Sequence, residues 1–302
     1  MRFGTSIAEP RGSRALSSLR EQLRQAAEDG FHSAWMANIC GRDALTALAA
    51  AGLGVPGIEF GTAVVPTYPR HPAVLAQQAL TAALALEGRL TLGIGLSHRI
   101  VIEDMYGYGF DAPAAHMSEY LSVLLPLLAG EQAAFEGTTL KANIGLTVPK
   151  SGEVPVMLAA LGPRMLRLAG QRTSGTILWM TGPATVRDYI APTINAAAAE
   201  AARPAPRIVC MLPVCVTDDA DGARARTARV LQIYGQLPSY RAMLDREGAQ
   251  GPADVAIVGD EDTVATQITD LANCGVTDFV AAEIPGPEGD RTRNLLKTLA
   301  RG

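Results

Sequence analysis

The sequence has few charged residues, few aromatic residues and few cysteines. Of its 302 residues, 19% are charged and 5% are aromatic, and the formal net charge is −4. An average soluble domain is about 25% charged. Because no block of five or six like charges occurs, we expect neither nucleic acid nor an anionic membrane surface as a partner. The first ten residues contain no apolar core of a signal peptide, so we expect a cytoplasmic protein.

Long apolar runs and metal-ligand spacings are also missing. The apolar stretch 121–129 is broken by Ser122 and Pro126 and is too short to cross a bilayer. The four cysteines are scattered, and no C-x-x-C or H-E-x-x-H motif occurs. Cys210 and Cys215 lie five residues apart in an expected strand, so their side chains point to opposite faces and do not share one metal ion. We therefore predict no metal site, and free thiols in a reducing compartment.

What the sequence does contain is a regular alternation of apolar runs and amphipathic segments. Eight apolar runs are expected to be strands, at 2–8, 33–37, 59–65, 90–95, 154–160, 175–180, 208–217 and 278–282. Helices are expected at 17–29, 43–51, 71–86, 113–129, 237–247 and 260–274, and from residues 163, 183, 219 and 289 onward. A polar, hairpin-like stretch at 131–150 interrupts the alternation.

This alternation predicts the fold class. Strands that alternate with helices form parallel βα units, and continuous apolar runs such as 208–217 are expected when both faces of a sheet are buried. Eight such units in about 250 residues or more predict an α/β fold of the (β/α)8 TIM-barrel type. A doubly wound sheet is the alternative. Because no linker composition interrupts the chain, we expect residues 1–302 to form a single domain.

Polar residues follow several of the expected strands, where a barrel places its chemistry. Glu9 follows the first strand and is a candidate for handling a proton. The fourth strand leaves through Gly93-x-Gly95, and glycines permit a sharp turn or a close backbone approach. Ser97 and His98 come next, and His98 is the candidate general acid or base because histidine exchanges protons near neutral pH. A dinucleotide-binding loop is the poorer interpretation, since the third glycine of G-x-G-x-x-G is missing; solvated loop residues are the simpler alternative.

The fifth and sixth strands end in residues suited to a cofactor. The fifth leads into Gly162, Pro163 and Arg164. A Gly-Pro helix start leaves backbone N–H groups pointing outward with the helix dipole behind them, and Arg164 adds positive charge. This predicts an anion site, most naturally for a phosphate, with an ordinary strand-to-helix corner as the alternative. Trp179 and Met180 end the sixth strand, where they pack either against a flat ring or into the core.

Four stretches together resemble one protein family. They are FGTAVVPTYPRHPAVLAQQ, LTLGIGLSHRIVIEDMYG, PVMLAALGPRMLRLAG and VTDFV. With them, nearly the whole chain resembles the luciferase-like monooxygenase superfamily and, within it, the coenzyme F420-dependent oxidoreductases. The resemblance implies a TIM barrel with short insertions that binds a flavin or deazaflavin at the carboxyl ends of its strands.

The resemblance also implies particular residues for the cofactor. A non-proline cis peptide bond is expected at Ala63–Val64, behind the flavin-type ring. The strand-four exit would line the ring and the phosphate side, and the strand-five turn would hold the phosphate. The expected cofactor contacts are Ala63, Val64, Gly95, Leu96, Ser97, Ala160, Leu161, Gly162, Pro163, Arg164 and Met180.

The chain departs from one branch of this family. Sugar-phosphate dehydrogenases of the family place a histidine after strand two and a glutamate after strand four, where this sequence has Ile39 and His98. Glu9 does match an acidic position of that branch. The leading hypothesis is therefore F420-dependent hydride transfer on a small organic substrate, with His98 as acid or base assisted by Glu9 or Ser97. An FMN-dependent monooxygenase and a non-catalytic cofactor-binding barrel are the alternatives, and a homodimer is expected.

Overall fold

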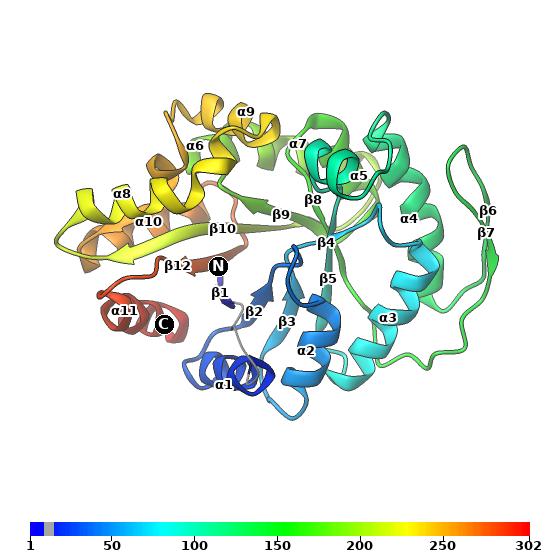
Figure 1. Cartoon of the computed structure of the whole chain (residues 1–302), viewed down its shortest axis with the longest axis horizontal. Helices are drawn as coiled ribbons and strands as arrows, with labels where there is room; N and C mark the ends of the chain where they lie inside the picture. The colour runs from blue at the N-terminus through cyan, green and yellow to red at the C-terminus, as the bar shows by residue number, and fades with distance from the viewer. Residues whose placement is uncertain (9–14) are drawn as a thin grey trace. The chain divides into compact units, whose positions relative to one another are not determined.

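The computed structural model describes residues 1–8 and 15–302 (Figure 1). Glu9, one of the expected catalytic residues, therefore lies outside the described residues. The described chain divides into two compact units. The first unit comprises Met1–Ile7, Gln25–Trp35 and Ala160–Gly302, and the second comprises Ala8–Arg24 and Met36–Ala159.

The first unit is built on a parallel sheet. Strand β1 (Arg2–Ser6) pairs with β2 (Ser33–Met36) on one side and with β12 (Asp278–Glu283) on the other. The ten-residue strand β10 (Arg207–Val216) then pairs with β12 and with β9 (Gly175–Trp179). Nearly every residue of β10 is buried, which agrees with the continuous apolar run expected of a strand covered on both faces.

Helices follow the strands of the first unit. The longer ones are α5 (Pro163–Arg172), α7 (Ala191–Glu200), α8 (Ala220–Leu231), α9 (Pro238–Glu247), α10 (Glu261–Asn273) and α11 (Gly289–Arg301), and α1 (Ala15–Glu28) crosses from the second unit into the first. Shorter helical turns are α6 (Pro183–Thr185), the π-helical turn η2 (Val186–Ile190), η3 (Gln232–Gly235) and η4 (Pro252–Val255).

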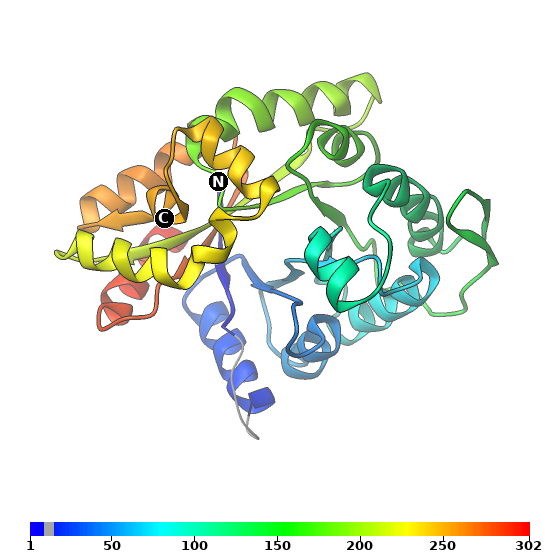
Figure 2. The ribbon, with the colours of Figure 1, turned by 45° about the horizontal axis from the view of Figure 1, so that its top comes forward.

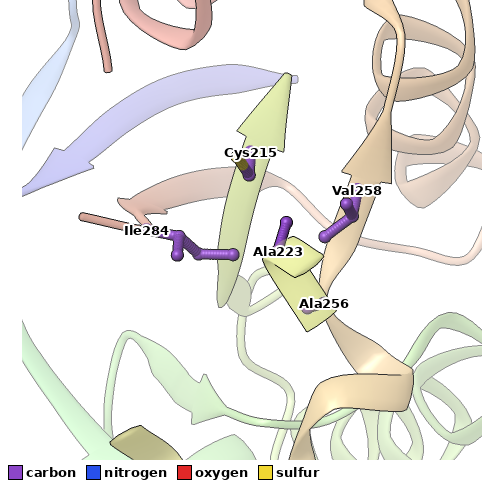
Figure 3. Packing of buried hydrophobic residues seen from close by; sticks show 5 residues of the cluster. All are labelled: Cys215, Ala223, Ala256, Val258 and Ile284. Atoms are coloured by element: carbon purple, nitrogen blue, oxygen red, sulfur yellow. The ribbon is translucent and has the colours of Figure 1, made fainter. Parts of the chain in front are cut away.

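The carboxyl end of β10 carries a strand that the sequence pattern did not predict. Strand β11 (Ile257–Gly259) pairs in parallel with Val214–Val216 of β10. An apolar cluster packs there, with Cys215 on β10 and Val258 on β11 (Figure 3). Its other members are Ala223, Ala256 and Ile284. Cys215 is thus a free, buried thiol in the core, and Cys210 is buried in the same strand.

The second unit centres on β5 (Leu90–Gly95). This strand pairs in parallel with β3 (Glu59–Thr62), β4 (Val65–Pro66) and β8 (Val156–Ala159). The sequence predicted one strand over 59–65, and the structure divides it into β3 and β4. The two-residue break between them is the pair Ala63 and Val64.

The helices of the second unit begin where the sequence predicted. They are α2 (Ala44–Gly52), α3 (Pro72–Ala85) and α4 (Pro113–Ala129), with a π-helical turn η1 (Val101–Met105) before α4. Asp43 caps α2 by accepting a hydrogen bond from the Thr46 backbone N–H at 2.8 Å. His71 caps α3, because its Nδ1 accepts from the Ala73 N–H at 3.3 Å. His71 is therefore the N-cap residue of α3, directly before the proline of its first turn.

The polar stretch after α4 forms a two-stranded hairpin, as its pattern predicted. Strands β6 (Ala133–Glu136) and β7 (Lys141–Ile144) are antiparallel and extend beside α4 (Figures 1 and 2). The carboxylate of Glu119, on α4, accepts hydrogen bonds from the backbone N–H groups of Thr138, Thr139 and Leu140 at 2.7–3.0 Å. The Thr139 hydroxyl donates a further bond at 2.7 Å, and these bonds lower the pKa of Glu119 to about 2.

Glu119 is expected to hold the turn of this hairpin in a pH-dependent way. Its pKa is lowered in the folded protein, so its contribution is complete above about pH 4.5 and is lost as the pH falls toward 2. We expect Glu119→Ala to reduce hydrogen-exchange protection of the amides of residues 138–140 at neutral pH, and the parent protein to lose the same protection in acid. Glu131→Ala, a change at an exposed glutamate, is the control. Unchanged protection in Glu119→Ala would contradict this role.

Candidate functional site

The corner between β3 and β4 contains the expected cis peptide bond, between Ala63 and Val64. Hydrogen bonds anchor this corner to its neighbours within the second unit. The Ala63 N–H donates to the Met36 carbonyl at 2.8 Å. The buried Thr62 hydroxyl donates to the Gly93 carbonyl at 2.8 Å and accepts from the Gly93 N–H at 2.9 Å. The prediction of a cis bond at this position is confirmed.

The end of β5 explains the second glycine of the Gly-x-Gly pattern. Pro66 lies opposite Gly95 in the strand pairing, and the Thr67 N–H donates to the Gly95 carbonyl at 3.0 Å. A Cβ atom on residue 95 would lie 2.6 Å from Cγ2 of Val64 and 3.1 Å from Cβ of Ala159. Glycine at this position therefore lets the Val64 side chain pack directly on the strand end.

The chain turns sharply after Leu96. Ser97 has a φ of 61°, in the left-handed region that few non-glycine residues adopt. His98 follows and is half-buried, and its carbonyl accepts hydrogen bonds from the N–H groups of Val101 and Ile102 at 2.9 and 3.0 Å. Burial lowers the pKa of His98 below its ordinary value of 6.5. Its imidazole is therefore neutral at pH 7 and able to accept a proton.

A stack of rings that no sequence pattern indicated adjoins the same segment. The Tyr68 ring is stacked between His116, with centroids 4.0 Å apart, and Phe110, with centroids 5.2 Å apart. The Arg99 guanidinium lies over Phe110, and His116 Nε2 is 3.0 Å from the Thr67 hydroxyl oxygen. The stack holds Arg99, the residue after His98, close to Thr67 and Tyr68, which follow β4. The one sequence signal was a histidine in the first turn of an amphipathic helix.

The expected phosphate turn lies in the first unit and leads from Ala160 into α5. Gly162 is the N-cap residue and Pro163 the first helical residue, and within the described residues no side chain accepts a hydrogen bond from the first turn of this helix. Gly162 and Arg164 are exposed, and a Cβ atom on residue 162 would meet no heavy atom within 4 Å. Leu161 is half-buried. The first-turn N–H groups of α5 therefore face open space, as anion binding at a helix start requires.

A second Gly-Pro helix start in the first unit is already occupied by the protein itself. It lies at Gly182 and Pro183, before α6. The carboxylate of Glu247 accepts hydrogen bonds there from the Ala184 N–H at 3.0 Å and from the Thr185 N–H and hydroxyl, each at 2.7 Å. Of these two Gly-Pro starts, the one at α5 is therefore open to an external anion.

Met180 and Trp179 end β9 in the first unit. Met180 is fully buried and has a φ of 55°. The Trp179 ring meets the edge of Tyr234 at 5.9 Å between centroids. The packing of either side chain against a cofactor ring stays a prediction.

The structure thus groups the expected site residues by unit. The second unit brings together the residues between β3 and β4 and those at the end of β5: Ala63, Val64, Gly95, Leu96, Ser97 and His98. The first unit holds Ala160, Leu161, Gly162, Pro163, Arg164 and Met180. The described residues contain no cluster of three or more histidine, cysteine or acidic side chains that would hold a metal ion. None of the helices in the described ranges is long and apolar enough to cross a membrane.

Comparison with known proteins gives one family. A model of the luciferase-like monooxygenase family matches residues 1–278. The chain is 25% identical over 300 residues to the 5,10-methylenetetrahydromethanopterin reductase of Methanolobus tindarius, covering 90% of this chain and 91% of that protein. It is 29% identical over 282 residues to a provisionally named coenzyme F420-dependent oxidoreductase of Mycobacterium tuberculosis, covering 87% and 80% of the two chains.

Solved structures establish the fold. The coenzyme F420-dependent tetrahydromethanopterin reductase of Methanopyrus kandleri superposes with a TM-score of 0.84 at 22% identity, over 98% of this chain and 97% of that one. A type II Baeyer-Villiger monooxygenase of Pseudomonas putida in complex with FMN superposes with a TM-score of 0.77 at 18% identity, over 100% and 97%. The predicted fold, a luciferase-like (β/α)8 TIM barrel, is confirmed.

The packing of Val64 on Gly95 predicts a cost for any side chain at that position. We expect Gly95→Ala to lower the free energy of unfolding by about 1–3 kcal/mol, because overpacking forces neighbouring groups to move. Gly145→Ala, in the same unit, is the control, because a Cβ atom on residue 145 meets nothing within 4 Å. Urea denaturation of both variants measures the difference, and equal stabilities would contradict the close packing.

Proposed function

Because the chain belongs to the luciferase-like monooxygenase family, we propose that it is a coenzyme F420-dependent oxidoreductase acting on a small organic substrate. The observation that carries this proposal is the break between β3 and β4 at Ala63 and Val64, where Val64 packs against the end of β5. The family resemblance implies such a corner as the support behind a flavin-type ring. Relatives named for F420-dependent reactions support the deazaflavin over other cofactors.

The open helix start fits the anionic part of such a cofactor. The first turn of α5 offers backbone N–H groups that no side chain in the described part of the chain caps, and Arg164 adds a guanidinium. We propose that Leu161 to Arg164 hold the cofactor phosphate in the first unit. In the second unit, the proposed ring contacts are Val64 and the residues at the end of β5, Gly95 to Ser97.

His98 is the proposed general acid or base. Its imidazole is neutral at pH 7 because burial lowers its pKa, so it can accept a proton from a substrate hydroxyl or donate its own N–H. Ser97 and Glu9 are proposed to assist this transfer. A bound deazaflavin would supply hydride chemistry, since it has carbon where a flavin has N5 and reacts poorly with oxygen.

Three further expectations belong to this proposal. We propose that residues 1–302 act as a single barrel domain, that the protein is cytoplasmic, and that it is a homodimer. An FMN-dependent monooxygenase is the second candidate, because an FMN-bound monooxygenase shares the fold and an open helix start also suits the single phosphate of FMN. A barrel that binds the cofactor without turnover is the third.

Cofactor binding tests the proposal directly. We expect purified protein to bind coenzyme F420 tightly and FMN weakly in separate fluorescence titrations. Preference for FMN would overturn the deazaflavin assignment and favour the oxygen-using monooxygenase. Binding of neither would overturn the cofactor assignment and leave the fold unaffected. Deazaflavin binding without turnover across a substrate screen would favour the non-catalytic barrel.

The role of His98 predicts a specific kinetic change. We expect His98→Ala and His98→Gln to lower kcat about 10²-fold or more, the usual scale for an acid–base residue, with the Kd for the cofactor nearly unchanged. In the parent, protonation of His98 would reduce kcat/KM on the acid side, with an apparent pKa below 6.5. This acid limb should be absent from both variants. Normal turnover in His98→Gln would remove the histidine from the mechanism.

A further inference from the structure

Three segments of the first unit meet beside the proposed phosphate turn. Tyr189, on the π-helical turn η2, donates its hydroxyl to the Leu161 carbonyl at 3.1 Å. The Arg246 guanidinium, on α9, lies 4.0 Å from the centroid of the Tyr189 ring. A chain of direct contacts therefore runs from Arg246 through Tyr189 to the residue before Gly162. We refer to Arg246 and Tyr189 as the Arg246–Tyr189 platform.

The residue after Arg246, Glu247, anchors α9 to the start of α6. Glu247 binds the start of α6 through the N–H groups of Ala184 and Thr185 and the Thr185 hydroxyl. The same hydroxyl lies 3.3 Å from the Met243 carbonyl, one turn earlier in α9. These bonds fix α9 to the segment that leads directly into η2. Arg246 and Tyr189 are thus positioned before any ligand binds, which lowers the entropic cost of binding.

Exposed arginines lie on both α5 and α9 at this corner. Arg164 and Arg167 lie one turn apart on α5, and both are exposed, as is Arg246. Within the described residues, none of the three forms a hydrogen bond or an ion pair. Arg241, also on α9, is the contrast: its guanidinium bonds the Asp245 carboxylate and two backbone carbonyls. The corner therefore attracts anions, whereas the charge of Arg241 is used within the fold.

The chemistry of the guanidinium indicates what Arg246 can bind. A guanidinium holds its N–H donors in one plane, and this planar fork matches a carboxylate or a phosphate with two parallel hydrogen bonds. The Tyr189 hydroxyl is already bonded to Leu161, so the platform presents arginine donors to a ligand. The phosphate has its own donors in the first turn of α5. A ligand that uses both places carries a phosphate and, beyond it, a second anionic group such as a carboxylate.

We propose that Arg246 is a specificity-determining residue that binds the acidic tail of the deazaflavin cofactor beyond its phosphate, and so selects F420 over FMN. The inference rests on the proposed function, because it takes the turn at Leu161 to Arg164 as the phosphate site. Tyr189 is the positioning residue, because it supports Arg246 with its ring and the turn with its hydroxyl. FMN has the phosphate and lacks the carboxylate tail, so it gains nothing from Arg246.

Binding of three ligands to a set of variants tests the proposal. The ligands are F420, F420 from which the glutamate residues have been removed, and FMN. We expect Arg246→Ala to weaken F420 binding about tenfold or more, the scale of a lost charge-assisted hydrogen-bond pair, and to leave the other two dissociation constants unchanged. Arg246→Lys should recover part of the affinity, because it restores the charge without the planar fork. Tyr189→Phe should weaken all three ligands to a similar extent.

The matched control is Arg229→Ala. Arg229 is an exposed arginine on α8 that likewise forms no hydrogen bond or ion pair within the described residues, and it should not alter F420 binding. If the parent binds F420 and Arg246→Ala binds it equally well, the tail assignment is overturned and the proposed function stands. Equal weakening of F420 and of its tail-free form would also overturn it, by placing Arg246 at the phosphate. If the parent binds no deazaflavin, the proposed function itself fails.

Discussion

The arrangement of the second unit depends on one side chain that replaces part of a strand ladder. Pairing with β5 ends at Gly61 of β3, opposite Thr91, and resumes at Val65 of β4, opposite Ile94. This break would leave the polar backbone groups of Gly93 buried without partners. The Thr62 hydroxyl satisfies both, accepting from the Gly93 N–H and donating to its carbonyl. Unpaired backbone groups in a sheet are costly. This bridge therefore lets Ala63 and Val64 leave the sheet without loss of its continuity.

The position of Val64 also affects the end of β5 and the residues after it, up to His98. Val64, displaced from the ladder, packs on the end of β5 where Gly95 leaves room for it. The chain then turns at Ser97 in the left-handed conformation and presents His98 half-buried. Arg99, the residue after His98, contacts Phe110, and Phe110 stacks on Tyr68, which follows β4. The geometry around His98 is thus set by contacts made at the neighbouring strand.

Two helix starts in the first unit expose backbone N–H groups in the same way, but only one of them is capped by a side chain of the described residues. Both β8 and β9 are followed by a Gly-Pro helix start that exposes backbone N–H groups. At α6 the carboxylate of Glu247 satisfies those groups, and the same bonds hold α9 in place. At α5 no side chain of the described residues does so, and the arginines on its first two turns form no hydrogen bond or ion pair within that part of the chain. Because Glu247 accepts hydrogen bonds from the N–H groups at the start of α6, the start of α5 is the one of the two where an external anion can bind.

The sequence by itself determined the eight main strands, the helices at 43–51 and 71–86, and the hairpin after α4, because periodicity and turn composition are local. It also located the Ala63–Val64 bond through resemblance to a family. It did not predict β11, whose three residues are too few to show a period. Nor did it identify Glu247, Tyr189 or His116 as parts of a site, because each acts on residues at least 28 positions away in the chain. Only the tertiary structure decides which distant side chain satisfies a given backbone group, and that choice separates the filled helix start from the open one.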